Sequence, residues 1–195
     1  MIIYMFNSQN PKNIIAVTNR TLCERPFIEQ IERICVFEPK AVILREKDLS
    51  EENYLLLAKD VLNVCRKYGV PLIAHTYINA ARSLGLKAIH MPLPALRASK
   101  RPQGFSVVGA SVHSLNEARE AVSLGANYIT AGHIYATDCK KGLPPRGLDF
   151  LKEICQNVDI PVYAIGGIKK DTNQVNQVMS FGAAGACIMS DLMRL

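Results

Sequence analysis

The feature that most constrains the fold of this chain is a set of eight short apolar runs, rich in β-branched residues and spaced at fairly even intervals. Each run is nearly continuous rather than alternating between apolar and polar residues, which is typical of strands buried on both faces of a parallel sheet. The runs cover residues 14–19, 41–46, 71–75, 88–92, 106–113, 128–134, 161–167 and 185–190.

Helical patterns separate most of these runs, because apolar residues recur there at positions i, i+3 and i+4. Ser50 and Ser114 stand at N-cap positions, and Gly69, Gly125 and Gly182 stand where a helix would stop. The predicted helices cover residues 27–35, 51–69, 114–125, 148–156 and 172–182.

Eight strands alternating with helices predict a single-domain (β/α)8 TIM barrel over residues 1–195. Segment 94–105 is short and interrupted by proline and glycine, so we expect one abbreviated crossover. A doubly wound open sheet is the alternative. It is disfavoured because the number and spacing of the strands suit closure, and because no GxGxxG motif follows the first strand.

Composition and charge restrict the partners of this chain. No apolar run approaches the ~18–20 residues that would span a bilayer, and the first 13 residues make a poor signal peptide. The six cysteines form no CxxC pair and are expected to be reduced thiols, with Cys139 alone in a cationic segment. We therefore expect a cytoplasmic protein without a membrane partner.

The net charge of +6 is dispersed, which favours small anionic ligands, phosphates above all, over nucleic acid.

Polar side chains cluster at the predicted strand ends, where barrel enzymes build their sites. All four histidines lie at or near such ends, namely His75, His90, His113 and His133. Thr18 and Asn19 close the first strand, and Arg45 and Lys47 close the second. For any single histidine a structural role is the alternative, but four together predict a site at one mouth of the barrel.

Two glycine-containing stretches predict a phosphate site. AIGGI ends the seventh strand with Gly166 and Gly167, and GAAGACIMS contains the eighth strand and ends at Ser190. Paired glycines let backbone N–H groups approach an anion, and the loops after strands 7 and 8 commonly bind phosphate in such barrels. An ordinary turn is the alternative for the glycine pair.

Five segments together resemble the thiamin phosphate synthase/TenI superfamily, in that family's order and at its spacing. They are VILREKD (42–48), VVGASVH (107–113), ANYITAGHIYATDCKKG (126–142), IPVYAIGGI (160–168) and GAAGACIMS (182–190). The resemblance covers nearly the whole chain and implies the same small (β/α)8 barrel.

Departures from the synthase pattern affect its metal site. Synthases of this family carry an Asn-Asp pair after strand 3 and a second Asp in an HxGQxD motif after strand 4, and these aspartates serve Mg²⁺. Here the matching positions are His75-Thr76 and Ala95, and Ile43 replaces a glutamine that touches pyrophosphate. Because Mg²⁺ prefers carboxylate and phosphate oxygens, the resemblance implies that this chain cannot hold the metal in the same way.

The segment after strand 6, GHIYATDCKKG (132–142), resembles the TenI-like pattern GHxxxTDCKKG rather than the synthase pattern GPxFxTxTK. This implies a thiazole tautomerase, an isomerase that needs neither metal nor cofactor. His133 would move a proton from the ring carbon bearing the carboxylate to the exocyclic carbon, which a group titrating near neutrality can do. The residues expected to bind this thiazole phosphate carboxylate are Arg45, Lys47, Ser111, Lys140, Gly166, Gly167 and Ser190.

Two alternative functions remain at this stage: a thiamin phosphate synthase with an altered metal site, and a non-catalytic regulatory barrel of TenI type. The sequence also leaves open which cation binds the carboxylate, whether His75 or His113 assists His133, and whether loop 136–147 acts as a lid. A homo-oligomer is compatible with the sequence.

Overall fold

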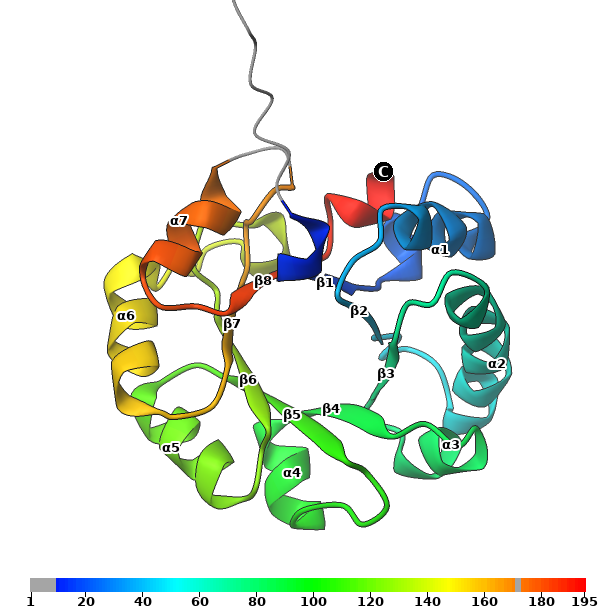
Figure 1. Cartoon of the computed structure of the whole chain (residues 1–195), viewed down its shortest axis with the longest axis horizontal. Coiled ribbons are helices and arrows are strands. Elements are labelled where there is room, and N and C mark those ends of the chain that lie inside the picture. The colour runs from blue at the N-terminus through cyan, green and yellow to red at the C-terminus, as the bar shows by residue number, and fades with distance from the viewer. Residues whose placement is uncertain (1–9, 171–172) are drawn as a thin grey trace, which may run out of the picture.

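The computed structural model describes residues 10–170 and 173–195, and its centre is a closed barrel of eight parallel strands in sequential order (Figure 1). The predicted TIM barrel is therefore confirmed, and the open doubly wound sheet is excluded. The strands are β1 (Ile14–Val17), β2 (Ala41–Leu44), β3 (Leu72–His75), β4 (Ala88–Pro92), β5 (Val107–Val112), β6 (Tyr128–Gly132), β7 (Val162–Ile165) and β8 (Gly185–Ile188).

A ring of helices surrounds the barrel (Figure 1). They are α1 (Phe27–Val36), α2 (Glu51–Lys67), α3 (Ile78–Ser83), α4 (Leu93–Ser99), α5 (Leu115–Ser123), α6 (Gly147–Asn157) and α7 (Gln174–Ser180). The predicted N-caps are confirmed, since Ser50 Oγ accepts from the Asn53 N–H at 3.3 Å and Ser114 Oγ accepts from the Glu117 N–H at 3.1 Å. Among the described residues, no helix is both long and apolar enough to cross a membrane.

The helical layer can be compared with the prediction in detail at its short elements. The short α3 was not predicted, and α4 has seven residues, which confirms the abbreviated crossover. Residue 172 of the predicted helix 172–182 lies outside the described residues, and α7 confirms its central part. After β8 the 3-10 helix η4 (Leu192–Arg194) stands beside α1 (Figure 1), where the Gln30 amide donates to the Leu192 carbonyl at 2.6 Å.

Side chains from the strands fill the barrel interior in a separate cluster. It consists of Ile15, Val17, Ala41, Ile43, Ile73, Tyr128, Tyr163 and Cys187, all buried. Because alternate residues of a strand point to the same side, the side chains two positions beyond Ile43 and Ile73 also belong to the interior. These are Arg45 and His75, which places both at the mouth of the barrel.

Candidate active site

Three polar residues form a row across neighbouring strands at the mouth. Leu44 pairs with Ala74 in the β2–β3 register, so the next residues, Arg45 and His75, stand side by side at the strand ends. His75 pairs with His90 in the β3–β4 register, and their rings stack with centroids 5.8 Å apart. The row combines one cation with two imidazoles.

His90 is fully engaged by its neighbours inside the barrel. Its Nδ1 lies 3.0 Å from the Tyr128 hydroxyl and its Nε2 lies 2.8 Å from Ser111 Oγ, to which Thr130 Oγ1 donates at 3.3 Å. Tyr128 reaches His90 because β5 carries Gly109, where a Cβ would lie 2.1 Å from the tyrosine ring. Burial, followed by the charge of Arg45, lowers the pKa of His90 to about 3, so its ring is neutral at pH 7. His90 and Ser111 therefore build the floor of the site.

The cations at the end of β2 face this floor. Arg45 is half-buried and forms no ion pair with any described residue, and burial lowers its pKa. Partial burial, together with the charges of Arg45 and Lys140, lowers the pKa of the Lys47 ammonium. An unpaired cation next to other cations is a favourable place for an anionic ligand.

The residue between these two cations, Glu46, was not singled out in the sequence, and it fixes the end of β2. It is buried, with its carboxylate accepting from the Thr18 hydroxyl at 2.6 Å and from the Arg20 guanidinium at 3.1 Å. Thr18 Oγ1 in turn accepts from the Arg45 backbone N–H at 2.9 Å. Arg20 also donates to Asp48 at 2.6 Å. Both carboxylates at this strand end are therefore ion-paired with Arg20, whose single positive charge offsets one of their two negative charges. The outward position of Glu46 in the strand alternation is the signal that could have revealed this role.

A pocket of about 400 Å³ lies next to β5 and β6 and contains two histidines. His113 Nδ1 donates to the Gly132 carbonyl at 2.8 Å, which leaves its Nε2 as an acceptor when the ring is neutral. His133 is 9% exposed, follows a cis peptide bond from Gly132, and holds its Nε2 3.4 Å from the Leu143 carbonyl, a long contact. The lining residues are His113, Gly132, His133, Lys140, Leu143, Pro144, Pro145 and Arg146.

Loop 136–147 extends from β6 toward the ends of β8 and β2. Cys139 Sγ lies 3.7 Å from Ser190 Oγ, just after β8. Cys139 lies close enough to Arg45 to raise the pKa of its guanidinium. The Lys140 ammonium lies close enough to Lys47 to lower the pKa of that side chain. The loop thus brings Lys140 to the same mouth as Arg45, Lys47 and Ser190. Their role in binding a substrate stays a prediction.

Gly166 and Gly167 pack against this loop after β7. Their φ angles are +102° and +71°, and added Cβ atoms would lie 2.3 Å from the His133 Cβ and 2.4 Å from the Ala136 carbonyl oxygen, respectively. Close approach of the two loops therefore requires glycine at both positions. Their use as phosphate ligands is a separate prediction, which these contacts do not test.

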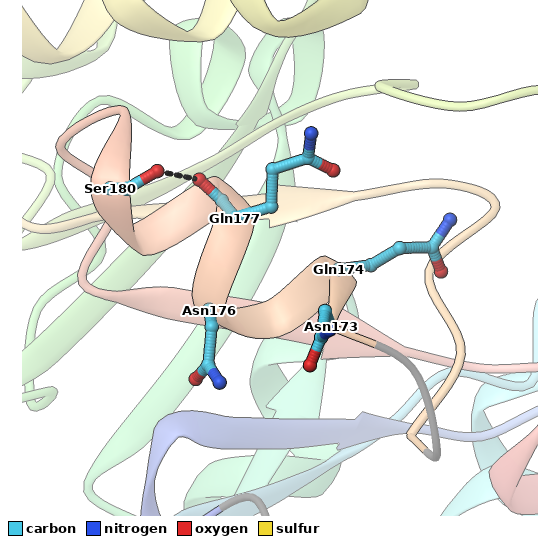
Figure 2. Close-up of a pocket in the computed structure, with 5 residues that line it drawn as sticks. All are labelled: Asn173, Gln174, Asn176, Gln177 and Ser180. Atoms are coloured by element: carbon cyan, nitrogen blue, oxygen red, sulfur yellow. Dashed lines mark hydrogen bonds between the residues drawn. The ribbon is translucent and has the colours of Figure 1, made fainter.

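A larger hollow of about 600 Å³ lies along α7, outside the barrel (Figure 2). Figure 2 shows it lined by Asn173, Gln174, Asn176, Gln177 and Ser180, with Ser180 Oγ donating to the Gln177 carbonyl at 2.7 Å. None of these lining side chains titrates near pH 7. The barrel mouth, with its histidines and cations, is the better candidate for chemistry.

The mouth does not fit the magnesium ion of the synthases. Thr76 and Ala95 occupy the positions expected for its carboxylate ligands, and Glu46 and Asp48 are already held by Arg20. Within residues 10–170 and 173–195, no three His, Cys, Asp or Glu side chains are grouped to hold a metal.

A closed (β/α)8 barrel with polar and cationic groups gathered at the carboxyl ends of its strands has the organisation of a barrel enzyme. The family model described as thiamine monophosphate synthase matches residues 14–192. The chain therefore belongs to this family, TMP-TENI, whose members are enzymes of thiamine biosynthesis.

Relatives support the family assignment. The chain is 33% identical over 171 residues to thiamine-phosphate synthase 2 of Streptococcus pneumoniae, covering 86% of this chain and 80% of that protein. It is 30% identical over 188 residues to thiamine-phosphate synthase of Syntrophomonas wolfei, covering 93% and 88%. A solved structure of thiamine phosphate pyrophosphorylase from Pyrococcus furiosus superposes with a TM-score of 0.78 at 27% identity, covering 94% of this chain and 88% of that one. These names favour the synthase alternative over the tautomerase.

Proposed function

We propose that this chain is a thiazole tautomerase of thiamine biosynthesis. It would convert the thiazole synthase product into 2-(2-carboxy-4-methylthiazol-5-yl)ethyl phosphate. The observation that carries the proposal is the set of cations at the mouth, which offers Arg45, Lys47 and Lys140 to an anion while Glu46 and Asp48, the carboxylates at the end of β2, are held by Arg20. Such a site suits an anionic substrate and a reaction without a metal ion.

His133 is the proposed acid–base group. It lines the pocket beside β6 together with His113 and two cations, Lys140 and Arg146. The reaction removes the proton from the ring carbon bearing the carboxylate and places a proton on the exocyclic carbon, with aromatisation as the driving force. A histidine can take up and return a proton near pH 7. His113 is the alternative base, because its Nδ1–H bond to Gly132 leaves Nε2 able to accept.

The substrate phosphate is proposed to bind between the loops after β7 and β8, at Gly166, Gly167 and Ser190. The phosphate would then lie two strands away from Arg45 and Lys47, because only β1 separates their strand β2 from β8. Ser190→Asp is the direct test, because a carboxylate there would repel the phosphate without adding a Cβ at a tightly packed glycine. A bound phosphate elsewhere in the mouth, with this place empty, would contradict the assignment.

Thiamin phosphate synthase is the second candidate, and the names of the relatives favour it. Two assays on the purified chain separate the two. The first supplies the thiazole synthase product in EDTA and follows the ultraviolet spectrum of the aromatic thiazole. The second supplies the pyrimidine pyrophosphate, thiazole phosphate and Mg²⁺ and measures thiamine phosphate. We expect turnover in the first assay and none in the second. The reverse result would establish the synthase. Ligand binding without turnover in either assay would favour a regulatory barrel.

A further inference from the structure

One ring nitrogen of His75 has no hydrogen-bond partner among the residues that the structure describes. The residue is only 5% exposed, and its Nδ1 lies 2.8 Å from Thr76 Oγ1. Its distal nitrogen, Nε2, forms no hydrogen bond with any residue of the described part of the chain. A buried polar atom left unpaired is costly and uncommon in folded proteins. His90, its stacking neighbour, contrasts with it because both of its ring nitrogens are engaged.

The ring of His75 lies inside the barrel at the end of β3, beside the ring of His90. His75 lies two positions after Ile73, which belongs to the interior cluster, and its ring stacks on His90 inside the barrel. The β2–β3 register places Arg45 beside it. The positive charges of Arg45 and Lys47 both lower the pKa of His75. Its ring therefore lies within the electrostatic field of the two cations.

The chemistry of this nitrogen can be assigned from its surroundings. Burial, then the neighbouring His90, Arg45 and Lys47, lowers the pKa of His75 to about 2, so its ring is neutral. When the Thr76 hydroxyl donates to Nδ1, the ring hydrogen resides on Nε2. An N–H donor next to a guanidinium and an ammonium suits a ligand with two anionic oxygens, such as a carboxylate.

We propose that His75 Nε2–H, together with Arg45 and Lys47, binds the ring carboxylate of the thiazole substrate and thereby makes the site selective for the carboxylated thiazole. The inference rests on the proposed function. His75 contributes binding and orientation in this assignment, and the proton transfer is left to His133. The phosphate, at the ends of β7 and β8, and the carboxylate, at the ends of β2 and β3, would then bind at two separate places around the mouth, which orients the ring between them.

Two variants separate the roles of the two ring nitrogens. In His75→Gln the amide nitrogen lies near the place of Nε2, whereas in His75→Asn it lies near the place of Nδ1. Calorimetry measures the binding of two ligands to each protein: the carboxythiazole phosphate product and the same thiazole phosphate without the carboxylate. For His75→Asn we expect a loss of about 10-fold or more in affinity for the carboxylated ligand. For the other ligand we expect a change of less than about 3-fold. His75→Gln should retain the wild-type preference to within about 3-fold.

Three outcomes would overturn the assignment: an equal loss for both ligands in His75→Asn, no loss for either, or a His75→Gln variant as weak as His75→Asn. A wild-type chain that binds neither thiazole would overturn the proposed function itself. A wild-type preference that survives in His75→Asn would overturn the role of His75 alone. If His75→Asn does not fold, the wild-type chain labelled with ¹⁵N-histidine provides the test. The carboxylated ligand should shift the Nε2 resonance of His75 more than the uncarboxylated one, and equal shifts would overturn the assignment.

Discussion

Gly166 packs so closely on His133 that a Cβ on the glycine would lie 2.3 Å from the histidine Cβ. The same glycine accepts a backbone hydrogen bond from Tyr135 at 3.0 Å. The loop after β7 thus fixes the position of the proposed acid–base residue at the end of β6. Gly166, which the sequence pattern assigns to phosphate binding, is therefore also required for steric reasons, because the contact with His133 leaves no space for a Cβ.

The contact between Gly166 and His133 predicts that the Gly166→Ala variant is less stable than the wild-type chain. The substitution adds a backbone clash to an unfavourable positive φ, so we expect a loss of roughly 3 kcal/mol or more in the free energy of unfolding. Gly104→Ala is the matched control, because Gly104 has φ +90° and nothing within 4 Å of an added Cβ, and it should lose only about 1 kcal/mol. Urea denaturation measures both. Equal losses in the two variants would mean that the contact with His133 is not restrictive.

The buried histidines predict a loss of stability in mild acid. The pKa values of His75 and His90 fall from 6.5 to about 2 and about 3 in the folded chain. The unfolded chain therefore binds more protons between pH 6.5 and about 3, and stability falls as the pH is lowered through this window. From pH ~6.5 to pH ~5.5 we expect the free energy of unfolding to fall by about 2 kcal/mol in total.

Urea denaturation at the two pH values checks this prediction. His90→Gln should lower the stability at both values, because it disturbs the bonds to Tyr128 and Ser111, but it should halve the dependence on pH. A free energy of unfolding that stays constant between the two pH values would show that the two rings are accessible to protons in the folded chain.

Lys47 predicts a pH dependence of ligand affinity in the alkaline range. Partial burial, Arg45 and Lys140 lower its pKa from 10.5. Because lysine is charged below its pKa, the positive charge is lost as the pH rises through this lowered value. Affinity for the carboxythiazole phosphate should therefore decrease with rising pH before the ordinary lysine value of 10.5 is reached. Lys47→Arg should flatten the profile, because a guanidinium stays charged in this range. Parallel profiles for the two proteins would contradict the prediction.

The residues of the mouth predict that chelators of metal ions do not change the rate of the tautomerase reaction. Thr76 and Ala95 supply no carboxylate, and Arg20 occupies Glu46 and Asp48, so proton transfer should not depend on Mg²⁺. Tautomerase turnover in EDTA should stay within about 2-fold of the untreated rate, a difference below ~0.5 kcal/mol in the barrier. Loss of activity in EDTA that Mg²⁺ restores would refute the metal-free reaction.

Much of the fold could be predicted from the sequence because both sides of each strand are buried. Continuous apolar runs such as residues 128–134 therefore identified all eight strands. The predicted runs extended past the strands themselves, since β6 ends at Gly132 and β7 at Ile165. The extra residues are the ones that form the mouth. Helix α3 was missed because six residues, Ile78–Ser83, are too few to show a helical period.

The candidate site was less predictable, because its contacts join residues far apart in the chain. Strand alternation places Arg45 and His75 in the barrel, but only the register shows that they are neighbours. No local sequence pattern indicates that the Tyr128 ring packs over Gly109 and that its hydroxyl contacts His90. The contact between Cys139 and Ser190 is equally without a local signal. The burial of Glu46 between Thr18 and Arg20 likewise depends on the pairing of β1 with β2.

The most direct test follows the rate at which the thiazole synthase product becomes the aromatic carboxythiazole phosphate, recorded by ultraviolet absorbance. The wild-type chain, His133→Asn and a protein-free control are compared, with His113→Asn in parallel. We predict that the wild-type chain accelerates the conversion and that His133→Asn lowers kcat by about 10²–10⁴-fold, with ligand affinity changed much less. Near-wild-type turnover in His133→Asn with a collapse in His113→Asn would move the acid–base role to His113. A wild-type rate equal to that of the protein-free control would contradict the tautomerase assignment.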